Sequence, residues 1–209
     1  MQQRPNIVFY FSDQQRWDTL GCYGQRLDVT PNLDALAAGG TRYENAFTCQ
    51  PVCGPARACL QTGRYATEIG CEINGFALPF GRVKTLAQCF NEAGYATGYV
   101  GKWHLATDRL AGIDYEQSAI PAERRGGYKD YWMAADVLEF TSHGYNGYVY
   151  NADNERVPFV GYRADCINNF AIDFLHGRKE QVEPFFLFIS QIEPHHQNDR
   201  RRYEGPDGS

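Results

Sequence analysis

Three short runs rich in apolar residues constrain the fold of this chain more than any other feature of its sequence. They span residues 7–11, 95–100 and 185–190, and the first and last are nearly continuous in apolar side chains. A continuous run of this length is typical of a strand that is buried on both faces. We therefore expect the run at 7–11 to be a central strand and the other two runs to join it in one sheet.

Helical patterns lie between and beside these runs. We expect helices over 31–38, 55–62, 85–93 and 163–176. Thr30 precedes the first as an N-cap with proline at the next position, and glycines end the first three. The third begins with the capping-box spacing Thr-x-x-Gln, and the fourth has apolar residues at helical spacing.

Two further short strands are expected, at 41–47 and around 148–150, and the rest of 107–162 shows no clear pattern. Strands that alternate with helices predict an α/β fold with a largely parallel sheet. No internal repeat or obvious linker divides the chain.

Titratable and polar side chains follow each apolar run. Asp13 and Gln14 come after the first, Lys102 and His104 after the second, and His195 after the third. In open α/β sheets, ligands bind beyond the carboxyl ends of the strands. Each residue taken singly is equally compatible with a turn or a solvated loop, but their common position predicts a site at one edge of the sheet.

Cys53 lies just before the helix expected to begin near Pro55. Free N–H groups and the helix dipole favour an anion at such a position, and Arg57 is one helical turn away. A nucleophile beside an anion site and an arginine suits an enzyme that acts on a sulfate or phosphate ester. The alternatives are a buried structural cysteine and an enzyme that uses the bare thiolate.

The pattern Cys-x-Pro-x-Arg at 53–57 resembles the signature of the sulfatases, a family in which this cysteine is oxidised to formylglycine. Ala56 departs from it, because many members carry serine there. Further stretches resemble the family in the same order along the chain: 4–9, 30–37, 62–64, 94–105 and 194–195. The resemblance implies an α/β, alkaline-phosphatase-like sandwich with a largely parallel central sheet flanked by helices.

The resemblance also implies a divalent cation, usually Ca²⁺ and in some members Mg²⁺ or Mn²⁺. Asp13, Gln14 and Cys53 occupy the positions of its ligands in this part of the chain. Many members have a second aspartate where this chain has Gln14, whose amide oxygen can still bind a hard cation. Asp-Gln pairs occur in relatives that cleave phosphonate monoesters and phosphodiesters, so such a hydrolase is the alternative function.

Five residues receive catalytic roles from the resemblance: Cys53, Arg57, Lys102, His104 and His195. Formylglycine hydrates to a diol, one hydroxyl of which attacks sulfur while the other later expels the sulfate. Arg57 would hold the diol, and Lys102 would bind a sulfate oxygen. His104 would act as a base, and His195 would protonate the leaving group. The expected reaction is hydrolysis of a sulfate monoester.

Members of the family are usually longer than 209 residues, and their remaining metal ligands follow the third signature. Asp199 and Asp207 are the only aspartates after residue 196 that could be such ligands, and neither follows an expected strand. We therefore expect residues 1–209 to be the N-terminal part of a catalytic domain, truncated before those ligands and inactive alone. An inactive fragment or a binding protein on the same scaffold is the competing interpretation.

The net charge and the lengths of the apolar runs exclude some classes of binding partner. The net charge of −5 argues against nucleic acid and against an anionic membrane surface, and no apolar run is long enough to span a bilayer. The expected partners are a small-molecule or sugar sulfate ester and the maturation enzyme that generates formylglycine. The N-terminus lacks a signal-peptide pattern, which favours a cytoplasmic location unless a leader has been removed.

Overall fold

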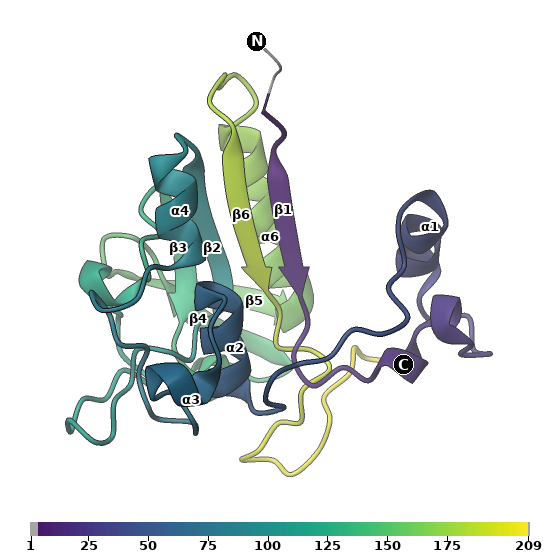
Figure 1. Cartoon of the computed structure of the whole chain (residues 1–209). Helices are drawn as coiled ribbons and strands as arrows, with labels where there is room; N and C mark the ends of the chain where they lie inside the picture. Colours follow the sequence, from purple (N-terminus) through teal and green to yellow (C-terminus); the bar gives the residue numbers. More distant parts are fainter. Residues whose placement is uncertain (1–3, 209) are drawn as a thin grey trace.

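The structure is a computed structural model that describes residues 4–208. Its centre is a six-stranded sheet in the order β1-β6-β2-β3-β4-β5 (Figure 1). The first four strands in this order run parallel, and β4 and β5 are antiparallel to their neighbours. The strands are β1 (Ile7–Phe11), β2 (Ala96–Lys102), β3 (Tyr131–Ala135), β4 (Tyr145–Tyr150), β5 (Arg156–Tyr162) and β6 (Phe185–Ser190).

Helices cover both faces of the parallel part of the sheet. On one face, α2 (Cys53–Thr62) and α4 (Leu86–Glu92) pack over Phe186 and Phe188. On the other, α6 (Arg163–Gly177) packs over the alternate residues of β6. Because β6 is buried on both faces, its sequence reads as an uninterrupted apolar run. The predicted α/β fold with a largely parallel sheet is confirmed.

The prediction that residues 7–11 form a central strand is wrong. β1 lies at the edge of the sheet beside β6, and its burial alternates along the strand. Val8 and Tyr10 are 49% and 53% exposed, whereas the alternate residues pack against the α2 and α4 side. The apolar run alone could not distinguish an edge strand with an uncovered face from a central one.

Other predicted elements need smaller corrections. Residues 41–47 form no strand, and α2 begins at Cys53 rather than at residue 55. The strand expected at 148–150 is longer, and β3 and β5 were not predicted. The capping box of α4 is present as predicted, with the Thr85 side chain accepting from the Gln88 N–H.

A long excursion, residues 14–52, connects β1 to α2 and carries α1 (Pro31–Gly39). Figure 1 shows α1 standing apart from the sheet and its covering helices. The remaining short elements are η1 (Trp17–Thr19), η2 (Gly21–Tyr23), α3 (Ala66–Ile69), η3 (Ala122–Arg124) and α5 (Leu138–Thr141).

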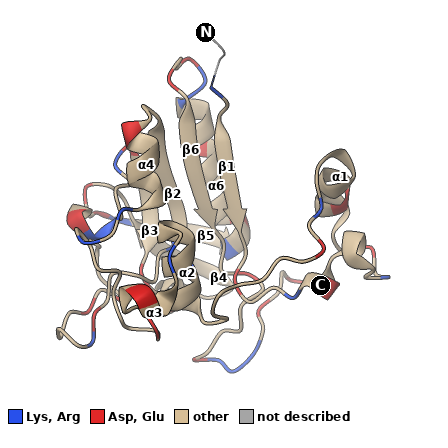
Figure 2. Cartoon of the chain, viewed as in Figure 1, with Lys and Arg blue, Asp and Glu red and all other residues tan. Residues whose placement is uncertain are grey.

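Charged residues are absent from the lengths of β1 and β6, as Figure 2 shows, and Lys102 is the last residue of β2. Within β1, β2 and β6, a charged residue is therefore found only at the end of β2. No helix within residues 4–208 has both the length and the apolar character needed to cross a membrane.

Candidate active site

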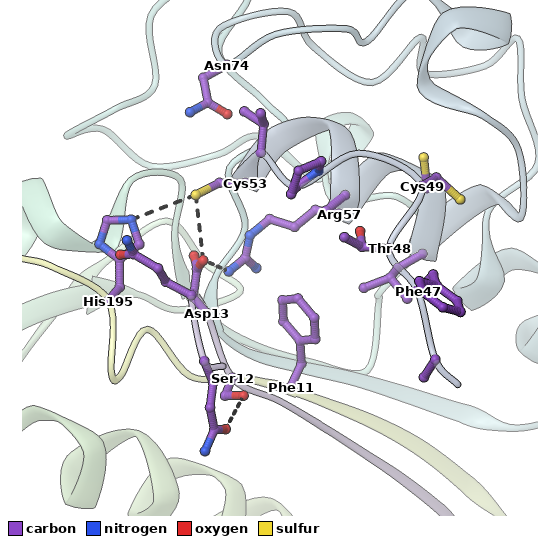
Figure 3. Close-up of a pocket in the computed structure, with 18 of the residues that line it drawn as sticks. Phe11, Ser12, Asp13, Phe47, Thr48, Cys49, Cys53, Arg57, Asn74 and His195 are labelled. Carbon is purple, nitrogen blue, oxygen red and sulfur yellow. Dashed lines mark hydrogen bonds and ion pairs between the residues drawn. The ribbon is translucent and has the colours of Figure 1, made fainter. Parts of the chain in front are cut away.

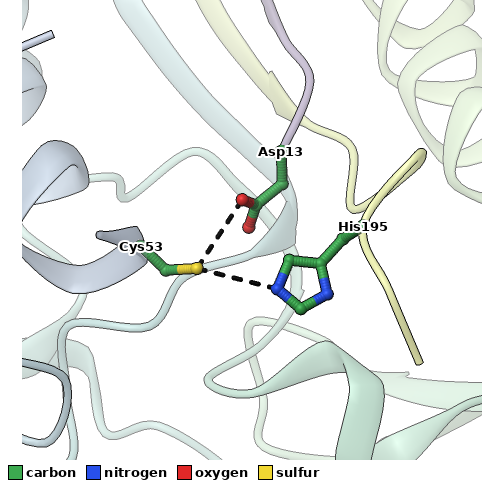
Figure 4. Close-up of side chains that lie close together, drawn as sticks. All are labelled: Asp13, Cys53 and His195. Carbon is green, nitrogen blue, oxygen red and sulfur yellow. Dashed lines mark hydrogen bonds between the residues drawn. The ribbon is translucent and has the colours of Figure 1, made fainter. Parts of the chain in front are cut away.

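Three residues that are distant in the sequence meet beyond the carboxyl ends of the parallel strands. The Sγ atom of Cys53 lies 3.6 Å from Oδ1 of Asp13 and 3.8 Å from Nε2 of His195 (Figure 4). Asp13 follows β1, His195 follows β6, and Cys53 is the first residue of α2. The sheet therefore assembles the site as the carboxyl-end rule predicted.

The ring of His195 is oriented by its own loop. Its Nδ1 lies 2.6 Å from the carbonyl oxygen of His196, which can only accept a hydrogen bond. The proton of the neutral ring is therefore on Nδ1, and the lone pair of Nε2 faces the Cys53 sulfur. Burial and the nearby charge of Lys102 lower the pKa of His195, which favours this neutral form.

Arg57 is buried and reaches Asp13 rather than the cysteine sulfur. Its Nη2 donates to Oδ2 of Asp13 at 3.0 Å, and its Nη1 donates to the Lys102 carbonyl at 2.7 Å and to the Ser190 hydroxyl at 2.5 Å. These contacts connect α2 to the ends of β2 and β6. Arg57 thus fixes the carboxylate that faces Cys53.

Lys102 is fully buried at the end of β2 and lies between two carboxylates. Its Nζ is 3.1 Å from Oδ2 of Asp13 and 2.9 Å from Oε1 of Glu139. Asp13, Arg57, Lys102 and Glu139 form a set of two buried anions and two buried cations, which we term the ionic quartet. Burying these charges is tolerated because each faces a partner of opposite sign.

The charges of the ionic quartet support one another. Burial by itself would raise the pKa of Asp13, but Lys102 and Arg57 outweigh burial and hold that pKa well below its usual range. Burial would likewise lower the pKa of Lys102, but Glu139 and Asp13 raise it instead. All four groups are therefore charged at neutral pH, with a net charge of zero.

His104, two residues after Lys102, is close enough to the quartet to be affected by its charges. Its backbone has φ of +56°. Its Nδ1 is buried and has no hydrogen-bond partner among the described residues. Burial, together with the charge of Lys102, lowers the pKa of His104 to about 3. The ring is thus neutral, and neither Lys102 nor His104 lines the large cavity described below.

Gln14 points its side-chain oxygen toward the backbone of the segment after β6. Oε1 accepts from the His196 N–H at 3.0 Å, and Gln14 itself has φ of +59°. One lone pair of the amide oxygen remains for another partner. Gln14, the predicted cation ligand beside Asp13, thus also connects the end of β1 to the loop that carries His195 through a hydrogen bond.

A cavity of about 970 Å³ opens in front of Cys53 (Figure 3). Asp13, Cys53, Arg57 and His195 lie along its polar side, and Figure 3 shows Phe47 and Cys49 on the opposite side. Apolar side chains make up much of the remaining wall: Phe11, Val52, Leu60 and Tyr65. The cavity is large enough for a drug-sized molecule with the reactive group at one end.

The donor atoms of Asp13, Cys53 and His195 lie within 4.8 Å of one another, so they could approach a single ion. A thiol and an imidazole suit a softer metal, whereas Ca²⁺ prefers six to eight oxygens. An oxygen at position 53 would change the set to oxygen donors from residues 13, 14 and 53. The residues present therefore fit part of a hard-cation site.

Two residues at the site were not predicted from the sequence. Glu139 pairs with Lys102, and the Asn74 side-chain oxygen accepts from the Gly54 N–H at 2.8 Å, at the start of α2. Asn74 thus occupies an N–H that was expected to face an anion. The available signal for Glu139 was a single charge inside the run Val-Leu-Glu-Phe at 137–140, which is unusual in a buried segment.

Comparison with known proteins identifies the family. The family model described as Sulfatase matches residues 5–208. The chain belongs to the sulfatase family. The uncharacterized sulfatase YidJ of Escherichia coli is 38% identical over 204 residues, which cover 93% of this chain and 39% of that protein. The chain spans between 31% and 41% of the lengths of four curated relatives it matches.

Solved structures agree with this assignment to the sulfatases. BT4656, solved in complex with its substrate D-glucosamine-2-N,6-O-disulfate, matches with a TM-score of 0.75 and 29% identity, over 92% of this chain and 35% of BT4656. The phosphonate monoester hydrolase of Agrobacterium radiobacter matches with a TM-score of 0.62 and 25% identity, over 92% of this chain and 41% of that one. The predicted alkaline-phosphatase-like fold is confirmed.

Proposed function

We propose that this sulfatase-family chain carries the nucleophile of a sulfuric ester hydrolase, with Cys53 converted to formylglycine. The contact of Cys53 with Asp13 and His195, at the head of the cavity, is the observation that carries the proposal. These three residues come from three separate elements, and their meeting point is where an α/β sheet binds its ligand.

The unmodified thiol is poorly suited to be the nucleophile itself. Burial raises the pKa of Cys53, and the negative charge of Asp13 opposes the helping charges of Lys102 and Arg57. A bare thiolate enzyme requires the opposite shift. This favours the modified residue over the thiolate alternative, because a hydrated aldehyde supplies one hydroxyl for attack and a second for release of sulfate.

A divalent cation would be held by Asp13, Gln14 and the oxygen at position 53, and would polarise the sulfo group. Ca²⁺ is the proposed ion, with Mg²⁺ and Mn²⁺ as alternatives. Three oxygen donors fall short of the coordination of Ca²⁺, so we propose that further ligands come from outside residues 1–209. Calorimetric titration of Ca²⁺ should give markedly weaker binding to the 209-residue chain than to the whole protein.

The remaining side chains supply charge and proton transfer. Arg57 would hold the position-53 oxygens through its fixed place beside Asp13, and Lys102 would contact a sulfate oxygen. His195 would contact the ester oxygen, accept the proton of the attacking hydroxyl on the Nε2 lone pair that faces position 53, and pass that proton to the leaving alcohol. His104, neutral and with a buried unpaired Nδ1 within the described structure, would accept a proton at the second step.

Mass spectrometry of the peptide that contains Cys53 tests the modification. The protein should be coexpressed with a formylglycine-generating maturation enzyme, and the peptide should then carry an aldehyde that reacts with hydrazide reagents. The C53A variant, made in parallel, should not hydrolyse 4-nitrophenyl sulfate. An unmodified thiol in protein that nevertheless turns over the sulfate ester would contradict the formylglycine mechanism.

A phosphonate monoester or phosphodiester hydrolase is the second candidate, favoured by the neutral Gln14 beside Asp13. Replacing a carboxylate by an amide removes one negative charge near the cation, and an Asp-Gln pair resembles the one found in relatives that cleave phosphonate monoesters and phosphodiesters. The ratio of kcat/KM for a sulfate ester to that for a phosphonate monoester separates the two functions. The Q14D variant should shift this ratio toward the sulfate ester.

A further inference from the structure

Glu139 is a buried carboxylate whose role the proposed reaction does not yet include. It lies in α5, just after β3, and its side chain is 4% exposed. Oε1 accepts from the Lys102 ammonium at 2.9 Å, while Oε2 is buried without a hydrogen-bond partner in residues 4–208. A half-satisfied buried carboxylate is costly, and native structures keep such groups where they have a specific task.

The corner between β3 and α5 holds the whole segment that follows β2. The Asp136 carbonyl accepts from the His104 N–H at 2.7 Å. The Asp136 carboxylate accepts from the N–H groups of three successive residues, at 2.9 to 3.0 Å: Leu105, Ala106 and Thr107. Glu139, three residues later, takes the Lys102 side chain. One short corner thus fixes the backbone of this segment and the direction of its lysine.

The corner is itself anchored to the loop that carries His195. The Gln197 side chain donates from Nε2 to the Glu139 carbonyl at 2.9 Å, and its Oε1 accepts from Arg163 at 3.1 Å. Gln197 is 1% exposed, so this link lies inside the protein. Glu139 is therefore held in place by the loops after β3 and β6, and it is not free to follow Lys102 if the lysine moves.

Charge balance gives Glu139 a defined effect on Lys102. The ionic quartet has two anions and two cations, and Lys102 is shared between Asp13 at 3.1 Å and Glu139 at 2.9 Å. Without the charge of Glu139, Lys102 would be drawn fully onto Asp13, which Arg57 already contacts. The quartet would also carry one uncompensated positive charge.

We propose that Glu139 is a positioning residue for the reaction, which shares the Lys102 ammonium with Asp13 and directs it toward the substrate's sulfo group. This inference rests on the proposed function of the site. Glu139 would not touch the substrate. It acts through Lys102 and leaves Oδ1 of Asp13 facing position 53.

Kinetics of E139Q in the whole protein test the proposal, with 4-nitrophenyl sulfate as substrate. Glutamine keeps the shape of the side chain and removes its charge. We expect kcat to fall by about 10- to 100-fold, as for other residues that orient catalytic groups. KM should change by less than about 3-fold, because the substrate is still bound by a cationic site. E139D, which restores the charge, should recover most of the lost kcat.

The exposed residue Glu180 provides a matched control, because E180Q makes the same chemical change at the surface. E180Q should leave kcat and KM unchanged. Thermal melting of all three variants separates positioning from folding. The proposal expects E139Q to lose turnover even at temperatures where it is fully folded.

Binding of inorganic sulfate gives a readout that needs no turnover. Calorimetry at a fixed Ca²⁺ concentration should show that E139Q binds sulfate more tightly than the unaltered protein, because removing a buried negative charge favours an anion nearby. Tighter sulfate binding combined with slower turnover is the signature of a positioning residue. A purely structural role would weaken both.

Two results would overturn the proposal. One is an E139Q variant with kcat and sulfate affinity within twofold of the unaltered protein. The other is weaker sulfate binding together with a lower melting temperature and no recovery in E139D. If the unaltered protein does not hydrolyse the ester but E139Q still tightens sulfate binding, the proposed function fails while the placement of Glu139 against Lys102 stands.

Discussion

Strand β2 and helix α1 are segments of similar length that differ in how far their residues are buried. All seven residues of β2 are buried, whereas none of the nine residues of α1 is. Helix α1 also has apolar residues, yet Leu36 is 72% exposed. β2 lies between β6 and β3, whereas α1 is held mainly by hydrogen bonds to the nearby turn at 21–23. Burial therefore follows long-range pairing rather than apolar content, and Lys102, at the end of β2, carries this burial into the ionic quartet of the candidate site.

The largest effect on stability is expected from removing a charge in the ionic quartet, at the buried end of β2. D13A leaves Arg57 and Lys102 facing each other without their shared carboxylate. We expect the free energy of unfolding to fall by about 3–5 kcal/mol, as when one partner of a buried ion pair is removed. Urea denaturation measures this. D28A, at an exposed position of the excursion, should change stability by less than about 0.5 kcal/mol.

One glycine in β2 and one in α1 are expected to differ in how much stability is lost when each is replaced by alanine. Gly101 in β2 has φ of +102°, and a Cβ there would collide with the Ser190 carbonyl. G101A should therefore destabilise the protein by about 2–3 kcal/mol. Gly39, at the end of α1, has open space around it, so G39A should be neutral or slightly stabilising. Equal effects of the two substitutions in thermal melting would contradict the contrast.

Asp34 is the residue to remove within the excursion. Its carboxylate accepts from the Cys22 N–H at 2.6 Å and from the Thr30 hydroxyl at 3.2 Å. D34A should cost about 1 kcal/mol, the usual contribution of such hydrogen bonds. Native-state hydrogen exchange should show faster exchange at the Cys22 amide and unchanged exchange in β2. Faster exchange in both places would mean that the excursion and the sheet unfold together.

The smallest expected effect is a change of stability with pH near the end of the described chain. Burial would raise the pKa of Glu204, but the Gly144 N–H, Arg200 and Arg202 outweigh it and lower the pKa to about 2. Because the folded pKa lies below the ordinary value of 4.5, the stabilisation is present above about pH 4.5 and is lost as the pH falls toward about 2. E204Q should flatten this part of the stability profile, and an unchanged profile would refute the assignment.

Three of the four parallel strands, β1, β2 and β6, could be predicted because their sequences carry a local signal. β6 is apolar along nearly its whole length because both of its faces are covered. The start of α4 is marked in the sequence by the capping box of Thr85 and Gln88. β5 gave no such signal, since it is an antiparallel strand in which Phe159 alone is buried and the apolar Val160 is exposed. Its pairing with β4 depends on a partner that the local sequence does not identify.

The candidate site was predictable to the extent that it follows strand ends. Asp13 and His195 were selected by that rule, Cys53 by its position at the start of a helix, and all three by the resemblance. The structure brings their side chains together. Glu139 was not, because α5 has only four residues and follows a strand that was itself unpredicted. A charge buried by tertiary contacts has no signature in the sequence until its partner, here Lys102, is placed.

The Asp136 carboxylate surrounded by three backbone amides has a consequence for conformational entropy. Backbone N–H groups that converge in this way form a receptor for an anion, and here the anion is tethered to the protein. It cannot dissociate, so residues 105–107 keep their shape whether or not a ligand is bound. The conformational entropy of this loop is lost during folding rather than on binding. A ligand that contacts Lys102 and His104 therefore does not have to order them.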